Sequence, residues 1–206
     1  MESATPPQRR LFRTIEPFIL ASASPRRRRL LESLGLEFEV VVSGVEEHHS
    51  GSGSPSELVL GWARAKASAV AAIHAERWVL AADTIVVVAG TILGKPLDTR
   101  EARDMLAELS GRQHQVITAI CLRHQNCHHE ETEAVTTQVR FKKLSAAEIE
   151  AYIASGEPLD KAGAYGIQGL GGCLVRSIRG SYTNVVGLPL CETIERLAAH
   201  GIIAPC

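Results

Sequence analysis

The chain has 206 residues, enough for one sizeable α/β domain or for two small lobes that share a sheet. Hydrophobic residues make up 45% of it and aromatic residues only 4%, so a substantial but largely aliphatic core is expected. A net charge of −1 excludes a general polyanion binder, and no apolar run approaches the ~20 residues that a membrane span needs.

Residues 1–17 contain prolines and arginines but no hydrophobic segment, so they do not form a secretory signal. We expect a loose N-terminal extension over 1–17, with organelle targeting as an alternative role, and a single domain over 18–206. The five cysteines are an odd number in a chain too large to need disulfides. They indicate reduced thiols and a cytoplasmic location.

The segment Ile19–Leu31 is an apolar strand, a turn of small residues and a helix that starts at once. Ser24 is a natural N-cap and Pro25 suits the first helical position. The helix start, with four arginines beside it, presents unpaired N–H groups and a positive dipole end, which predicts a phosphate site. A solvated basic helix face is the alternative.

A second strand is expected over Phe38–Val42, followed by a loop over 43–54 that holds the adjacent carboxylates Glu46 and Glu47. The next helix starts with a proline and a capping box formed by Ser54 and Glu57. On this helix Lys66 either extends to solvent along the apolar side or reaches into a pocket.

Residues 78–82 form a buried-type strand that ends in Asp83-Thr84 and continues as 85–88. An acidic residue in such a run is costly without a partner, and open α/β sheets bind ligands at strand ends. We therefore favour a functional Asp83 over a capped structural one. After a short strand over 91–93, Gly94-Lys95-Pro96 projects a second lysine, and a helix opens at Asp98 and closes at 110–111.

Two long antiparallel strands are expected over His114–Leu122 and Ala134–Phe141, with 123–133 as the turn between them. Cysteines and histidines at this turn suggest a zinc site, although their spacing matches no common zinc pattern and a polar hairpin tip explains them as well. The residues concerned are Cys121, His124, Cys127, His128 and His129.

A capping box at Ser145 predicts a helix through Ala154. Residues 155–172 read as a glycine-rich loop that permits close backbone approach to a ligand and carries Asp160, Lys161 and Gln168. A strand over 173–178, a turn over 180–182 and a closing helix over 189–200 complete the chain.

Together these segments resemble the Maf family of nucleoside triphosphate pyrophosphatases, from about Ile19 to Leu197. The resemblance rests on the motifs ASASPRR (21–27), ADT (82–84), GKP (94–96), DKAGAYGIQG (160–169) and GSYTNVVGLP (180–189). It implies an α/β fold of the ITPase-like type. In this fold a long, mixed, twisted sheet flanked by helices forms two lobes, with the nucleotide in the cleft between them, commonly in a homodimer.

The branch that this chain resembles most hydrolyses dTTP and UTP to the monophosphate and pyrophosphate, removing non-standard or excess pyrimidine nucleotides. In it the specificity positions match Arg26, Thr84 and Gln168, and the proton acceptor matches Asp83. The charged residues of the family match Glu47, Lys66, Asp83 and Lys95. Further substrate contacts are expected from residues of the same motifs, namely Ser22, Ser24, Arg27 and Lys161.

The carboxylates Glu46, Glu47 and Asp83 offer hard oxygen ligands for Mg²⁺ or Mn²⁺. Asp83 either takes the proton from the attacking water or acts only as a metal ligand, and the sequence does not separate these roles. The amide of Gln168 can donate to and accept from the carbonyl and imide N–H of uracil or thymine, while Arg26 favours a carbonyl oxygen.

Two alternatives stand beside this hypothesis. The chain could prefer 7-methyl-GTP, as the other Maf branch does, although Thr84 and Gln168 argue against it. It could also be a regulatory nucleotide- or nucleic-acid-binding protein linked to cell division, for which the four arginines are the only support. No membrane association and no stable nucleic-acid partner are expected.

Overall fold

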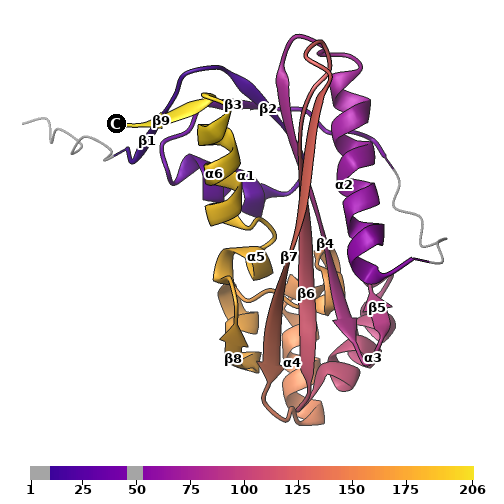
Figure 1. The fold of residues 1–206 in the computed structure, drawn as a ribbon. Helices are drawn as coiled ribbons and strands as arrows, with labels where there is room; N and C mark the ends of the chain where they lie inside the picture. The colour runs from indigo at the N-terminus through magenta and orange to yellow at the C-terminus, as the bar shows by residue number, and fades with distance from the viewer. Residues whose placement is uncertain (1–9, 46–52) are drawn as a thin grey trace, which may run out of the picture.

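The computed structural model describes residues 10–45 and 53–206 and is an elongated α/β molecule built on one mixed sheet (Figure 1). Its seven strands run in the order β3-β2-β4-β6-β7-β8, and β5 pairs with β4 outside this path. The strands are β2 (Phe18–Ala21), β3 (Phe38–Val40), β4 (Trp78–Val88), β5 (Thr91–Leu93), β6 (Gln113–His124), β7 (His129–Phe141) and β8 (Val175–Arg179). The expected α/β class with a mixed sheet is thus confirmed.

Strand direction changes at β4, which is parallel to β2 and antiparallel to β6. β2 is also parallel to β3, whereas the β4–β6, β6–β7 and β7–β8 pairs are all antiparallel. Such a mixed sheet needs a crossover helix only where its strands are parallel. The helices α1 (Pro25–Glu32) and α2 (Pro55–Ala71) supply these connections.

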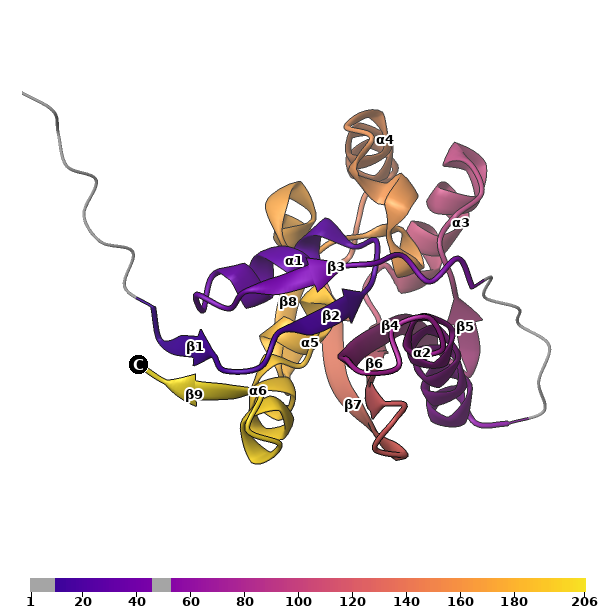
Figure 2. The same ribbon diagram turned by 90° about the horizontal axis from the view of Figure 1, so that it is seen from above.

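The helices cover the two faces of the sheet unequally (Figures 1 and 2). One face packs against α2, and its core includes alternate residues of β4 such as Val79, Ala81 and Ile85. On the other face α1 and α6 (Leu190–Ala199) cover one end of the long strands. The opposite end is covered by α3 (Thr99–Leu109) and α4 (Ala146–Ala154).

Two capped helices follow the predicted signals closely. Ser54 caps α2 and Ser145 caps α4, and each pairs reciprocally with the glutamate three residues later, Glu57 and Glu148. Such a box satisfies two of the N–H groups that a helix start leaves unpaired. Asp98 caps α3, and its side chain accepts a hydrogen bond from the Glu101 N–H.

The hairpin expected to turn over 123–133 is longer than predicted. β6 continues to His124 and β7 begins at His129, so only 125–128 form the turn. The polar composition of residues 130–133 predicts a loop, but these residues belong to β7 and pair with β6. They are partly buried or exposed, and polar side chains are tolerated at such positions of a sheet. The prediction of a long polar turn was wrong.

Other differences lie near the glycine-rich motifs and the ends of the chain. Residues 155–172 contain three short 3₁₀ helices, η1 (Glu157–Asp160), η2 (Ala162–Ala164) and η3 (Gly169–Leu174), where a loop was expected. The predicted turn at 180–182 leads directly into a helix, α5 (Tyr182–Val186), which Ser181 caps. Part of the predicted loose extension forms β1 (Phe12–Thr14), which pairs with β9 (Ile203–Pro205). Within the described part of the chain, no helix has both the length and the apolarity to cross a membrane.

Candidate functional site

A cavity of about 550 Å³ lies between the two ends of the molecule. The turn before α1 and the segment 42–45 line it from one end, and 94–95 with the η1–η2 region line it from the other. The middle of β4, the end of α5, and residues of α2 and β6 form the rest of the wall. The cavity therefore gathers four of the five motifs that the sequence analysis singled out, and it also touches the fifth, 180–189, at its end.

The turn into α1 has the features predicted for an anion site. Ser24 has extended backbone angles at the N-cap and Pro25 opens the helix, but the Ser24 side chain makes no cap hydrogen bond. The Ser24 N–H donates instead to Ser22 Oγ at 3.2 Å. Because no side chain caps them, the N–H groups of the first turn are suited to bind a phosphate.

The arginines of this helix point to different places. Arg26 lines the cavity and donates to Asp160 across it at 3.0 Å, whereas Arg28 pairs with Glu32 on the exposed helix surface. Arg27 is buried and donates to four main-chain or side-chain groups around the strand ends. The run is thus divided between the cavity, the protein interior and the exposed helix surface, where Arg29 also lies.

Arg27 holds three segments together. Its Nε donates to the Gly187 carbonyl at 2.6 Å, its Nη1 to the Ala82 carbonyl at 2.8 Å and to Ser22 Oγ at 3.1 Å, and its Nη2 to Thr84 Oγ1 at 2.9 Å. A planar guanidinium with five donors suits such a fan of acceptors. Arg27 was predicted to contact substrate, and the structure places its hydrogen bonds on the protein itself.

Asp83 and Thr84 point to opposite faces of the sheet because side chains alternate along a strand. Asp83, 4% exposed, faces α2, where its Oδ2 accepts from Lys66 Nζ at 2.8 Å. Its Oδ1 accepts from the Thr84 N–H at 2.7 Å. Lys66 is buried too, so its stem reaches into the cavity rather than to solvent.

Thr84 faces the other side and begins a buried chain of hydrogen bonds. Thr118 donates its single hydroxyl proton to the main-chain carbonyl of Asn184 at 3.0 Å. The Thr84 hydroxyl, 3.0 Å from Thr118 Oγ1, is therefore the donor in that pair. The Asn184 amide in turn donates to the Val116 carbonyl and to Thr137 Oγ1. This network connects the cavity wall to α5 and the long hairpin.

Thr118, Thr137 and Asn184 were not predicted as site residues from the sequence. Asn184 is fully buried, and it lies in the motif GSYTNVVGLP. A polar residue inside the otherwise apolar run NVVGLP was the available signal, since buried amides need hydrogen-bond partners. The two threonines carried no such signal, because threonine is common in strands.

Asp160 and Lys161 form the far wall of the cavity. Asp160 accepts from Lys161 Nζ at 2.6 Å and from Arg26 at 3.0 Å. Burial acts to raise the pKa of Asp160, but the hydrogen bonds from Lys161 and Arg26 outweigh it and hold that pKa below its ordinary value. Lys95 also lines the cavity and is exposed, so its ammonium is available to a ligand.

Two predictions do not find a place in this wall. Gln168 is exposed and precedes η3, outside the residues that line the cavity. Glu46 and Glu47, predicted as metal ligands, lie outside the described residues. Asp83 is thus the predicted metal ligand that the structure places in the cavity.

The zinc hypothesis at the hairpin is not supported in the form predicted. Cys121 is buried on the α2 face, where burial raises the pKa of its thiol to about 12, and Cys127 is exposed in the turn. The Nδ1 atom of His124 accepts from the Cys127 N–H at 3.3 Å. Alternation along β6 sends Cys121 and His124 to opposite faces of the sheet, so the five residues do not converge on one point.

The comparisons with known proteins agree with these motifs. The family described as "Maf-like protein" matches residues 17–200. A relative from Halalkalibacterium halodurans, named "dTTP/UTP pyrophosphatase", is 51% identical over 91% of this chain and 97% of its own length. A relative of the same name from Desulfotalea psychrophila is 47% identical over 94% of this chain and 100% of its own length. Another, from Salmonella typhimurium, is 53% identical over 87% of this chain and 90% of its own length. Among solved structures, the Staphylococcus aureus Ham1 protein aligns with a TM-score of 0.43 and 14% identity, covering 61% of this chain and 72% of that one.

Proposed function

The chain belongs to the Maf family, and from that premise we propose that it hydrolyses dTTP and UTP to the monophosphate and pyrophosphate. The observation that carries the proposal is the Asp83–Lys66 pair, buried in a cavity whose wall includes the helix start at Ser24. The relatives' names supply the substrate class. A family member that prefers 7-methyl-GTP is the alternative, and a panel of nucleotides separates the two.

Hydrolysis of a nucleoside triphosphate requires little covalent work from the protein, so charge neutralisation and positioning are the main tasks. The start of α1, Lys66 and Lys95 supply positive potential around the cavity. The Arg26–Asp160 ion pair is partly exposed, so it is weak enough to yield to a phosphate that competes for Arg26. The anionic chain of the substrate is therefore expected to lie along these groups.

Asp83 is proposed to accept the proton of the attacking water. A carboxylate has about four lone-pair sites, and the Lys66 and Thr84 donors occupy one on each oxygen. A lone pair thus remains for a water in the cavity. Lys66 holds the carboxylate in place and compensates its charge, as a buried pair requires.

The donor chemistry of the site also fits a hard divalent cation, Mg²⁺ or Mn²⁺. Asp83 supplies a carboxylate oxygen inside a cavity rich in phosphate-binding groups, and Glu46 and Glu47 are the further ligands proposed from the sequence. When bound, such an ion would polarise the phosphoryl group and lower the pKa of a coordinated water. Asp83 as a metal ligand alone is the alternative to its role as a base.

Choice of the base is proposed to rest on Arg26, Thr84 and Gln168. Arg26 and Thr84 line the cavity, and Thr84 is held by Arg27 and Thr118, so its position is well defined. Acceptance of both dTTP and UTP is expected, since one methyl group in an apolar pocket discriminates by only ~1–3 kcal/mol.

The test is pyrophosphate release with Mg²⁺ from dTTP, UTP, CTP, dATP, GTP and 7-methyl-GTP, in wild type and in Asp83→Asn. We expect release from dTTP and UTP and a loss of about 100- to 10,000-fold in the variant. Asp104→Asn, which alters an exposed carboxylate on α3, is the matched control and should keep wild-type rates. Near-normal turnover of Asp83→Asn at saturating metal would refute both roles of Asp83, and silence on every nucleotide would refute the reaction.

The proposal also covers the cellular location and the oligomeric state of the protein. All five cysteines are free thiols, four of them exposed, which suits the reducing cytoplasm. A homodimer is proposed from the family resemblance, and light scattering on the purified protein tests it.

A further inference from the structure

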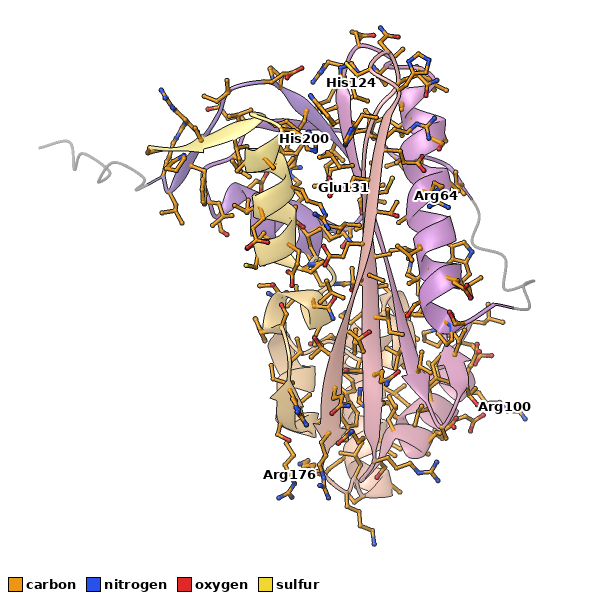
Figure 3. The ribbon with its side chains drawn as sticks, viewed as in Figure 1. Arg64, Arg100, His124, Glu131, Arg176 and His200 are labelled. Carbon is orange, nitrogen blue, oxygen red and sulfur yellow. The ribbon has the colours of Figure 1, made fainter. Side chains whose placement is uncertain are left out.

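A second polar cluster lies away from the cavity, between the β6–β7 hairpin and the end of α6 (Figure 3). Three histidine rings surround Trp78 there, with ring centroids 5.1 Å away for His124, 5.3 Å for His129 and 4.9 Å for His200. Glu131 on β7 lies among them. The cavity wall includes none of these residues.

Three of these side chains offer ligand atoms to a common point. The donor atoms of His129, Glu131 and His200 all lie within 4.8 Å of one another. His200 Nε2 is 3.2 Å and His129 Nε2 is 4.0 Å from the same oxygen, Glu131 Oε2. The side chains of His129, Glu131 and His200 are 33%, 35% and 25% exposed, so the cluster lies near the surface of the molecule.

The surroundings orient these groups as a metal site requires. Arg196 Nη1 forms an ion pair with the other carboxylate oxygen, Glu131 Oε1, at 2.8 Å, which directs Oε2 toward the histidines. Within the described residues, His129 Nε2 is buried as an atom and makes no hydrogen bond. His124 also contacts Trp78, but its ring nitrogens are not among the converging ligand atoms.

We propose that His129, Glu131 and His200 form a binding site for Zn²⁺ or a similar divalent transition metal. Two imidazole nitrogens and one carboxylate suit zinc, cobalt, nickel or copper rather than magnesium, which prefers oxygen ligands. Ligands about 2.0–2.1 Å from a tetrahedral zinc lie roughly 3.3 Å apart, so the His200–Glu131 spacing already fits. To reach the same spacing, His129 Nε2, now 4.0 Å from Glu131 Oε2, must move about 0.7 Å toward that oxygen, and water completes the coordination.

The three ligands come from segments that are distant in the sequence. Two lie on β7 next to the hairpin turn, and the third follows α6, the helix that begins after the cavity residue Gly187. A bound ion would connect the hairpin to the C-terminal helix. Because it lies outside the cavity, its effect is expected on stability and not on the chemistry proposed for Asp83.

The experiment uses the full chain after treatment with a chelator. Zn²⁺ is titrated by calorimetry, and Ni²⁺ and Cu²⁺ are titrated by tryptophan fluorescence, because open-shell ions beside Trp78 quench its emission. We expect one saturable site with a micromolar or tighter Kd. A 100-fold excess of Zn²⁺ over Kd should raise the thermal midpoint by roughly 5 to 10 °C.

His129→Gln and His200→Gln should each weaken Zn²⁺ binding by at least about 100-fold, more than the loss of an outer-shell partner does. His128→Gln is the matched control, because His128 is exposed in the same turn and should bind as wild type does. Circular dichroism with chelator present shows whether each variant is folded. His200→Cys keeps a zinc ligand at this position and should recover part of the Zn²⁺ affinity that His200→Gln loses. Wild-type affinity in both glutamine variants, or no saturable binding below about 100 µM in the folded wild type, would overturn the proposal.

Discussion

Replacement of Lys66 by methionine would leave Asp83 buried without its cation. The two side chains are 11% and 6% exposed, with Nζ 2.8 Å from Oδ2, so the ion pair is almost entirely removed from water. Breaking a buried pair at one partner costs about 3–5 kcal/mol, because the remaining charge stays desolvated. In a chain of this length each kcal/mol lowers the thermal midpoint by about 2–4 °C. Lys66→Met should therefore melt roughly 6 to 20 °C below wild type.

The assay is thermal unfolding followed by circular dichroism, with a chelator present so that no cation replaces the ammonium. The double variant Lys66→Met/Asp83→Asn should be more stable than Lys66→Met, since the uncompensated charge is then gone. Arg28→Met is the matched control, because it breaks an exposed pair with Glu32 and should cost no more than about 0.5 kcal/mol. If Lys66→Met lies within about 1 kcal/mol of wild type, or the double variant regains nothing, the reasoning about this pair is refuted.

Three further predictions concern glycines, pH and substrate choice. Gly61→Ala, inside α2 with open space around an added Cβ, should raise the free energy of unfolding by about 1 kcal/mol in urea titrations. Gly171→Ala, whose Cβ would lie 2.3 Å from a backbone oxygen, should lower it by about 1–3 kcal/mol, and equal effects would contradict the packing described. Burial lowers the pKa of His114 from 6.5 to about 4, so the unfolded chain binds more protons between these values and stability falls as the pH drops from 6.5 to 4. The loss is about 3 kcal/mol and should vanish in His114→Gln, and an unchanged pH profile in that variant would refute the assignment. Gln168→Glu should alter the ratio of dTTP to UTP turnover more than the Mg²⁺ dependence, and an unchanged substrate profile would remove Gln168 from base selection.

Local signals predicted the helices well because each such signal acts within one turn of the chain. The capping boxes at Ser54 and Ser145 specify where α2 and α4 begin, and the structure shows both boxes formed. The turn around Ser24 was equally readable, because a strand, a cap and a proline leave few alternatives. The position of Asp83 in an apolar run indicated correctly that it has a partner.

Amino-acid composition was a weaker predictor of secondary structure where polar residues lie on a strand. The hairpin residues 123–133 look like a loop, yet most of them continue the ladder between β6 and β7, since a strand surface open to solvent carries charges freely. The pairing of β1 with β9 joins the two ends of the described chain, and no local pattern encodes such a contact. The same holds for His200, which meets Glu131 only after α6 folds back on the sheet.

The arginines at positions 26–29 show why the sequence can indicate a basic site without indicating what each arginine does. Successive helical residues are turned by about 100°, so Arg26 reaches the cavity, Arg27 the sheet and Arg28 the solvent. The four acceptors of Arg27 come from three segments, and one of them, Gly187, is 160 residues away. Charge alone predicts an anion site for all of these side chains. Only the fold shows that Arg27 uses its donors to position Thr84 and the strand ends, whereas Arg26 extends across the cavity to Asp160.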